Sequence, residues 1–264
     1  METKEYKVTL MRDAAAAGHQ PGYLLWIGCA GAFDRRYQKV AQAFAKTLIH
    51  CGIDFACLGS EETCTGDPAR RAGNEMLFQM QALQVIETFK RYNISRIITI
   101  CPHCFNTFKN EYPDLGGHYE VIHHSQFLQK LVDEGKLNID KSIFSGQQIT
   151  FHDPCYLGRA NKEYDAPRKV LEAAGIDVME MPRNKSFALC CGAGGAQMFK
   201  EAEPGTKEVY AERTEEALAT GAGIVATACP FCMTMITDGL KKASKEESVQ
   251  NLDIAEIIAQ ALGI

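Results

Sequence analysis

The sequence predicts an α/β protein made of two tandem repeats, each a small parallel sheet flanked by helices. Three observations in the 264 residues lead to this prediction. Short apolar runs typical of strands alternate with longer segments whose apolar residues recur at helical spacing. The cysteine spacing of the first half returns in the second half. The hydrophobic content of 46% is that of an ordinary globular protein with a sizeable core.

The repeat is clearest in the cysteines. Cys29 and Cys64 lie 35 positions apart, as do Cys155 and Cys190, and each half then carries a Cys-Pro-x-Cys turn. Matched cysteines lie 126 residues apart for the first two members and 128 apart for the last two. The matched pairs are Cys29 with Cys155, Cys64 with Cys190, Cys101 with Cys229, and Cys104 with Cys232. The flanking text also agrees, IITICPHCFNTF against IVATACPFCMTM.

Each half therefore reads as one domain, at 23–146 and 147–264, after a lead segment or linker at 1–22. In the first domain, strands are expected within 23–28, 52–59, 96–100 and 119–124, and helices within 33–50, 68–92 and 125–135. In the second domain, strands are expected within 148–154, 177–181 and 224–228, and helices within 166–175, 206–221 and 253–262.

Alternating strands and helices predict parallel sheets with helices on both faces. Ligands of such sheets bind beyond the carboxyl ends of the strands. Most of the repeated cysteines follow a predicted strand directly or after a loop. We therefore expect thiols that are distant in sequence to meet at one rim of each sheet.

The eleven cysteines are not expected to form a disulfide framework. Their number is odd, and the N-terminus lacks the cationic start and apolar core of a signal peptide. A disulfide within the vicinal pair Cys190–Cys191 is disfavoured by ring strain and by a reducing cytosol. The second half offers five thiols, whereas a tetrahedral zinc site takes four ligands. An iron–sulfur cluster, in which sulfur can bridge irons, has a use for the fifth.

The pattern C-x34-C-C-G-x36-C-P-F-C in the second half resembles the cysteine-rich CCG domain. That domain occurs in heterodisulfide reductase subunits of the B and D type, in iron–sulfur subunits of glycolate and lactate oxidases, and in iron–sulfur proteins linked to electron-transfer flavoproteins. The resemblance covers the chain from Tyr23 onward. It implies a non-cubane [4Fe-4S] cluster in the second domain, with these ligands: Cys155, Cys190, Cys191, Cys229 and Cys232.

The first half departs from this pattern because Thr65 stands where the second half has Cys191. Four thiols remain there: Cys29, Cys64, Cys101 and Cys104. Four thiolates suffice for an ordinary cubane [4Fe-4S] cluster, which is the expectation for this half. The missing fifth thiol weakens a mechanism that needs two identical non-cubane centres and favours an electron relay.

The resemblance implies an iron–sulfur oxidoreductase subunit in a hetero-oligomeric complex. It would accept electrons from a flavoprotein or a ferredoxin-like partner and pass them to a disulfide, a quinone or another carrier. A non-catalytic relay in a flavoprotein-linked complex is the first alternative, and a zinc-stapled interaction module is the second. The mixed charges, with a net charge of −5, give no basic stripe for nucleic acid. Without a transmembrane segment, we expect a cytoplasmic protein, or one peripheral to a membrane complex.

The roles of several histidines and arginines are left open by the sequence. His103, inside the C-P-H-C turn, is a candidate proton donor or an exposed turn residue. His152 and Asp153 either hydrogen-bond a thiolate or sulfide or form the turn before Cys155. His123 and His124 are more typical of structural positions than of ligands. Arg70, Arg71 and Arg159 follow cysteine motifs, and they either bind an anionic substrate or compensate cluster charge, or form an ordinary salt bridge at a helix start.

Cys51 and Cys57 are predicted to be small core residues. Trp26, Phe33 and Phe199 are expected in the core or shielding a cluster. The methionine-rich helix within 68–92 is expected to pack mainly into the core, although it could also pack a partner.

Overall fold

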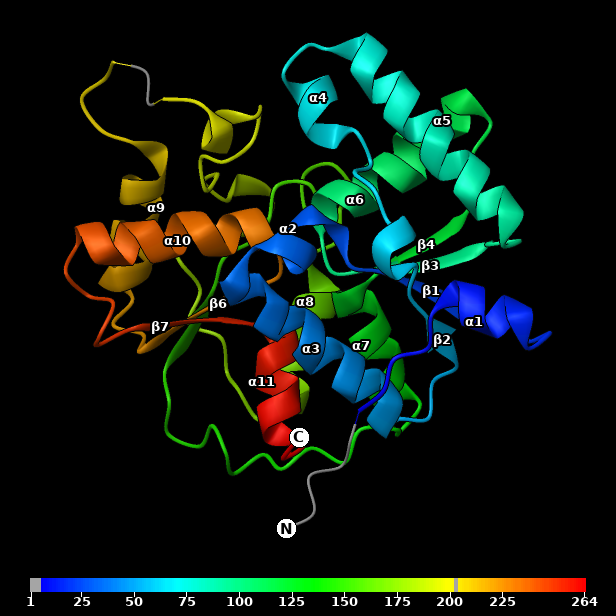
Figure 1. The fold of residues 1–264 in the computed structure, drawn as a ribbon. Helices are drawn as coiled ribbons and strands as arrows, with labels where there is room; N and C mark the ends of the chain where they lie inside the picture. The colour runs from blue at the N-terminus through cyan, green and yellow to red at the C-terminus, as the bar shows by residue number, and fades with distance from the viewer. Residues whose placement is uncertain (1–5, 202–203) are drawn as a thin grey trace.

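The computed structural model describes residues 6–201 and 204–264, and it contains two parallel sheets (Figure 1). The first sheet has the order β2-β1-β3-β4 and the second β5-β6-β7. Their strands are β1 Tyr23–Trp26, β2 Phe55–Ala56, β3 Arg96–Thr99, β4 Glu120–His123, β5 Ile149–Phe151, β6 Ile224–Thr227 and β7 Gln250–Asp253. The predicted α/β class with parallel sheets is confirmed.

The two sheets share one topology. Strand β5 takes the place of β1, β6 that of β3, and β7 that of β4, and the pairing in both sheets is parallel. Val178 bridges Ile149 where the first sheet has β2. The strand expected within 177–181 is therefore a single bridge. Strand β7 was not expected, because three of the four residues in its sequence QNLD are polar and it lacks an apolar run. It lies at the edge of its sheet.

The lead segment and the first domain have seven helices among their described residues, and three of these, at 11–16, 28–33 and 102–106, were not predicted. The seven helices are α1 Met11–Ala16, α2 Gly28–Phe33, α3 Arg35–His50, α4 Asp67–Arg71, α5 Glu75–Arg91, α6 Pro102–Asn106 and α7 His124–Asp133. The single helix predicted within 68–92 is broken after α4, because Gly73 is left-handed and the Asn74 side chain caps α5. Part of the predicted lead segment also packs on the first domain, since Leu10 bridges Cys57 and Met11 is buried.

The second domain has four helices among its described residues: α8 Asp165–Ala173, α9 Val209–Ala219, α10 Pro230–Lys242 and α11 Ile254–Ala261. Helix α10 was not predicted from the sequence. Shorter turns complete the described chain, namely the 3-10 turns Gly59–Glu61, Tyr112–Leu115, Lys185–Phe187 and Gln197–Phe199 and a π-turn at Thr107–Glu111. None of the described helices has the length and apolar character needed to cross a bilayer.

The domains share a core that lies between the two sheets. Helix α3 of the first domain packs on α11 of the second, and α8 of the second packs on α7 of the first (Figure 1). These two contacts are equivalent in the repeat, so the interface has pseudo-twofold symmetry. Phe44 and Phe127 meet Phe151 and Ile254 in one apolar cluster, which fixes the two sheets relative to each other.

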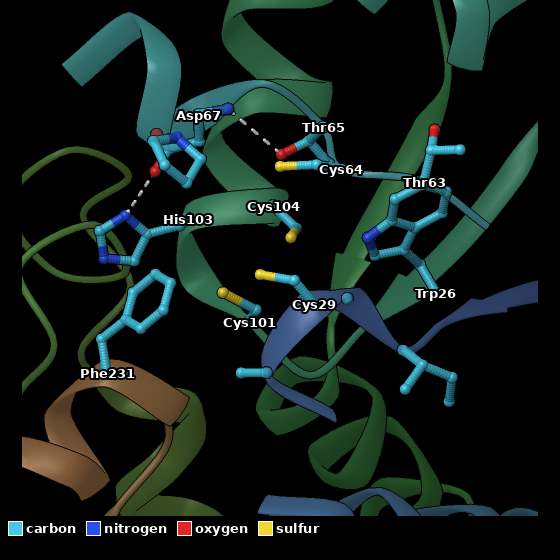
Figure 2. A pocket seen from close by; sticks show the side chains of 14 residues that line it. Trp26, Cys29, Thr63, Cys64, Thr65, Asp67, Cys101, His103, Cys104 and Phe231 are labelled. Atoms are coloured by element: carbon cyan, nitrogen blue, oxygen red, sulfur yellow. Dashed lines mark hydrogen bonds and ion pairs between the residues drawn. The ribbon is translucent and has the colours of Figure 1, made fainter. Parts of the chain in front are cut away.

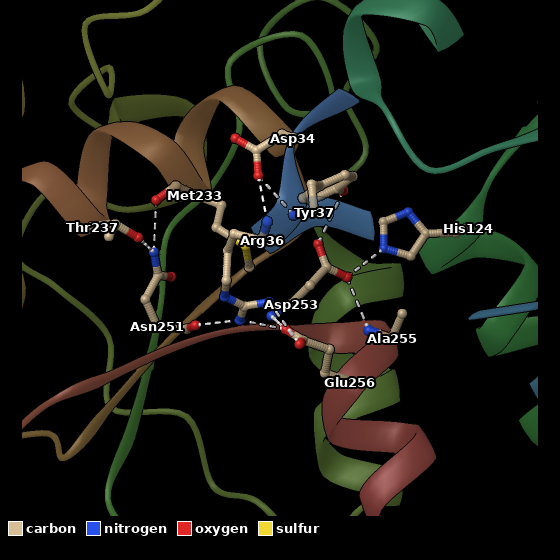
Figure 3. A network of polar contacts seen from close by, with 10 residues as sticks. All are labelled: Asp34, Arg36, Tyr37, His124, Met233, Thr237, Asn251, Asp253, Ala255 and Glu256. Atoms are coloured by element: carbon tan, nitrogen blue, oxygen red, sulfur yellow. Dashed lines mark hydrogen bonds and ion pairs between the residues drawn. The ribbon is translucent and has the colours of Figure 1, made fainter. Parts of the chain in front are cut away.

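A polar network crosses the same interface (Figure 3). Arg36 forms a bidentate ion pair with Glu256, with both N–O distances at 2.7 Å. The imidazole of His124 lies 2.9 Å from Asp253, and both side chains are fully buried. Tyr37 donates to the carbonyl of Ile100, at 2.7 Å, and to Asp253. The network ties the start of α11 to the residue that precedes Cys101.

Helices α9 and α10 touch so closely that one glycine is required. A Cβ placed on Gly239 would lie 1.9 Å from Oγ1 of Thr214, which is buried on α9. We expect Gly239→Ala to destabilise the chain by about 1–3 kcal/mol through overpacking, despite the higher helix propensity of alanine. Urea unfolding measures the change. Gly223→Ala is the control, because nothing lies within 4 Å of its Cβ; equal effects would contradict the packing explanation.

Candidate functional site

Helix starts and strand ends position the repeated cysteines. Cys29 lies in α2, three residues after β1, and Cys155 follows β5 in the equivalent turn. Cys101 and Cys229 are the N-cap residues of α6 and α10, and proline occupies the first helical position after each. Proline suits that position because the first helical N–H has no intrahelical partner. The predicted meeting of distant thiols at the carboxyl ends of the strands is what the structure shows.

In the first domain, four thiols point toward one another in a pocket (Figure 2). Cys29 lies close to Cys64, and Cys101 lies close to Cys104. Cys101 and Cys104 are buried, whereas Cys29 and Cys64 are half-buried. The pocket is thus lined by two buried and two half-buried thiols.

In the second domain, five thiols form a connected group. The Cys191 and Cys232 sulfurs are 3.3 Å apart. Cys190 contacts both Cys155 and Cys191, and Cys229 contacts Cys232. All eleven cysteines lie in the described ranges, and none forms a disulfide, the vicinal pair included. Cys57 is buried in the shared core and Cys51 packs against it, so neither joins a thiol group.

Both groups receive the same backbone hydrogen bond. The N–H of Gly66 donates to the sulfur of Cys64, and the N–H of Gly192 donates to that of Cys190, each at 3.4 Å. The two glycines are left-handed, with φ of 87° and 91°, a conformation that turns the N–H back toward the sulfur. In each domain the glycine two residues after Cys64 or Cys190 therefore donates a backbone hydrogen bond to that cysteine's sulfur.

The thiols influence one another's protonation. Contact with Cys29 lowers the pKa of Cys64 to about 7. Burial raises the pKa of Cys229, but contacts with Cys232 and His103 outweigh it and lower the value to about 5. Contact with Cys155 likewise lowers the pKa of Cys190. Contacts with neighbouring thiols and burial raise the pKa of the other six thiols. The thiolate, which is the form that binds metals, is therefore favoured at Cys64, Cys190 and Cys229.

The two groups approach each other at their Cys-Pro-x-Cys turns. His103 of the first turn stacks edge-on against Phe231 of the second, with ring centroids 4.7 Å apart, and it also contacts Tyr156. Phe231 lines the first pocket (Figure 2). The expectation that His103 could be an exposed turn residue is wrong, because only 6% of it is exposed.

His103 connects the first turn with a thiol of the second domain. Its Nδ1 lies 2.9 Å from the carboxylate of Asp67, and its ring also contacts the Cys229 thiol. Burial lowers the pKa of His103, but the bonds to Asp67 and Cys229 outweigh it and raise the value to about 10. The imidazole is therefore held as a proton-bearing group between the two thiol groups.

Thr65 occupies the position of the missing fifth thiol. It is buried beside Cys64, its hydroxyl lies 3.5 Å from the backbone N–H of Asp67, and its carbonyl accepts from Tyr112 (Figure 2). The side chain is thus used in the local turn. The donor set of the first group consists of four thiols.

The predictions for the arginines and the aromatic residues are confirmed at some positions and wrong at others. Arg70 and Arg71 pair with Glu111, so they have structural partners, and Arg159 is exposed. Trp26 is buried as predicted. The placement of Phe33 and Phe199 in the core is wrong, because they are 86% and 63% exposed; Phe199 does reach the edge of Phe231.

The remaining polar candidates are buried, namely His123, His124, His152 and Asp153. His124 pairs with Asp253 across the domain interface, and Nδ1 of His123 lies 2.8 Å from the hydroxyl of Ser125. Asp153 accepts a bidentate ion pair from Arg168, and His152 lies beside the second thiol group. The inner face of α5 is buried as predicted, but four of its side chains are exposed: Met76, Leu77, Met80 and Leu83.

Sequence reasoning missed three polar residues near the sites. Asp67 holds His103, Arg213 holds His152, and Glu62 accepts from the backbone N–H groups of Ile27 and Gly28 next to Cys29. Burial raises the pKa of Glu62 to about 7. Asp67 could have been noticed, since it follows Cys64 within the same loop, whereas Arg213 lies on a helix with no local signal.

The donor chemistry fits iron–sulfur clusters. Each group offers thiols on turns at the carboxyl ends of strands, with a backbone N–H donor beside them, and in the second group a ring nitrogen of His152 lies near Cys191 and Cys232. A tetrahedral zinc ion would use four thiolates and leave one of the five in the second group without a role.

These features define a tandem thiol-rich α/β protein with one sulfur-lined site in each repeat. The chain belongs to the cysteine-rich domain family called CCG, which matches it twice, at residues 23–109 and 149–237. The resemblance inferred from the cysteine pattern is confirmed.

Relatives agree with this assignment. The chain is 45% identical over 251 residues to an EtfAB:quinone oxidoreductase of Syntrophomonas wolfei, covering 93% of this chain and 35% of the relative. It is 42% identical to a probable iron-sulfur-binding oxidoreductase, FadF, of Bacillus subtilis, covering 99% and 37%. It is 38% identical to the D-type polypeptide of the dihydromethanophenazine:CoB–CoM heterodisulfide reductase of Methanosarcina barkeri, covering 86% and 57%. The chain thus spans about a third to somewhat over half of these relatives.

Proposed function

We propose that this chain is the electron-transferring iron–sulfur part of a larger oxidoreductase. The single observation that carries the proposal is the gathering of nine thiols into two groups that face each other across one interface. The names of the relatives, an EtfAB:quinone oxidoreductase and a heterodisulfide reductase component among them, support the same class of reaction.

In this proposal the second group holds a [4Fe-4S] cluster of non-cubane type, and the first group holds a cubane one. The second ligand set is Cys155, Cys190, Cys191, Cys229 and Cys232; the first is Cys29, Cys64, Cys101 and Cys104. Bound clusters supply one-electron acceptance and donation. The protein supplies position, burial and hydrogen bonds.

In each site the half-buried thiols are the point at which electrons can pass to and from partner proteins or carriers. Cys29 and Cys64 are half-buried in the first group, as are Cys155 and Cys190 in the second. The proposed electron donor is a flavoprotein or a ferredoxin-like subunit or domain. The proposed electron acceptor is a disulfide, a quinone or another carrier. His103 is the candidate proton donor, because Asp67 and Cys229 hold its proton between the two sites.

Metal and sulfide analysis of anaerobically prepared chain tests the cofactor. We expect about eight irons and eight sulfides per chain when both groups are loaded. About four irons would mean that the cubane assignment of the first group is wrong. Stoichiometric zinc without sulfide would overturn the proposal and favour the zinc-stapled module.

A second experiment separates terminal reductase from relay. The reconstituted chain is mixed with a chemical reductant and an organic disulfide, and release of thiol is measured. The four-thiol first group favours a relay, so we expect no turnover without partner subunits. Turnover by the isolated chain would assign it the reductase role.

A further inference from the structure

Two buried ring nitrogens lie beside the thiol groups without a hydrogen-bond partner. In the described part of the chain, Nε2 of His152 and Nε1 of Trp26 both lack one. His152 precedes Cys155 by three residues and Trp26 precedes Cys29 by three, so the two rings occupy the same position of the repeat. The cost of burying an unpaired donor makes this coincidence informative.

Each ring is close to its thiol group. A ring nitrogen of His152 and the sulfurs of Cys191 and Cys232 lie within 4.8 Å of one another. Trp26 lines the first pocket, with its indole nitrogen on the side of Cys104 (Figure 2). Both side chains are about 1% exposed, so bulk water does not reach them.

Arg213 determines which nitrogen of His152 carries the proton. Its Nε donates to Nδ1 of His152 at 2.9 Å. Because a guanidinium has donors only, Nδ1 must offer its lone pair, and the proton of the neutral imidazole lies on Nε2. Arg213 is itself fully buried and fixed by Glu216 and by the carbonyl of Arg183, at 2.9 and 2.8 Å.

This tautomer makes His152 a donor and not a metal ligand. Ligation through Nε2 needs a lone pair there, which would move the proton to Nδ1 and place it against the N–H of Arg213. The indole of Trp26 can only donate. Both sites therefore present a ring N–H with the same hydrogen-bonding character, although the two residues differ in type.

We propose that His152 and Trp26 each donate a ring N–H hydrogen bond to a sulfur of the adjacent site, and that Arg213 positions His152 for this role. The inference rests on the proposed function, because the acceptor is a thiolate or sulfide of a bound cluster. A donor to cluster sulfur stabilises the more negative, reduced state. Its removal therefore lowers the reduction potential of that site alone.

Redox titration of the reconstituted chain, followed by electron paramagnetic resonance, tests the donors. His152→Leu is expected to reduce the equilibrium constant for reduction of the second site about tenfold, which is about 59 mV for one electron. His152→Gln, whose amide can replace the Nε2 donor, is expected to change it less. Trp26→Phe, which keeps the packing, is expected to shift the first site only. Unchanged potentials in His152→Leu and Trp26→Phe would overturn the inference.

Nitrogen NMR of the metal-free chain tests the tautomer without any cluster. With ¹⁵N-labelled histidine, His152 is expected to show a protonated Nε2 and an unprotonated Nδ1, and Arg213→Met is expected to remove this preference. A protonated Nδ1 would overturn the role of Arg213. In the loaded chain, strong hyperfine coupling from a directly bound imidazole nitrogen would overturn the donor role. A different outcome is a chain that shows the expected tautomer but assembles no cluster. In that case the role of Arg213 holds, whereas the proposed function fails and no cluster sulfur is present to accept the hydrogen bond.

Discussion

Replacing Cys191 with alanine is expected to remove the second-domain cluster, so that iron falls from about eight to about four per chain. Cys191 is 3% exposed and lies 3.3 Å from the sulfur of Cys232, in the middle of the five-thiol group. The substitution removes one of the five thiolates of the proposed ligand set. Iron and sulfide analysis, with the visible absorption spectrum, measures the effect.

Cys57→Ala is the matched control for this variant. Cys57 is also buried, but it packs in the shared core away from both thiol groups, and burial raises its pKa to about 12. We expect full iron content and only a modest loss of stability. A Cys191→Ala chain with the iron content and spectrum of the unmodified chain would refute the five-thiolate ligand set.

Asp253→Ala is expected to lower the free energy of unfolding by about 3–5 kcal/mol. The variant leaves His124 buried without its carboxylate partner at the domain interface and removes the side-chain cap of α11 (Figure 3). Tyr37 also loses one acceptor. Urea unfolding followed by the fluorescence of Trp26 measures the change.

Asp54→Ala supplies a control with the same chemistry in a different environment. Asp54 also lies 2.9 Å from a histidine, His19, but both side chains are 54% exposed. Exposed pairs contribute about 0–1 kcal/mol because water screens them. Similar losses of unfolding free energy in the two variants would show that burial at the interface does not explain the contribution of the Asp253–His124 pair to stability.

The interface has consequences for the first site as well as for stability. Tyr37 donates to the carbonyl of Ile100, the residue directly before Cys101. A buried residue of the shared interface thus bonds the backbone at the start of the first Cys-Pro-x-Cys turn. Tyr37 lies on α3, so this turn is tied to the packing of α3 on α11.

Much of the architecture could be predicted because its signals are local. Apolar runs placed β1, β3, β4 and β6, and helical spacing placed α3, α7 and α9. The errors occurred where tertiary contacts outweigh local pattern. Strand β7 forms from the polar sequence QNLD because Asn251 and Asp253 are engaged by Arg36, Met233 and His124.

The duplication, the α/β class and the nine repeated thiols follow from the amino-acid sequence, since spacing and residue type are properties of the chain. The folded arrangement was needed to show that the two thiol groups face each other, that His103 is held between Asp67 and Cys229, and that Arg213 fixes the proton of His152. These relations join residues 36 to 126 positions apart. They depend on the packing of two domains, and no local pattern encodes which side chains such packing brings into contact.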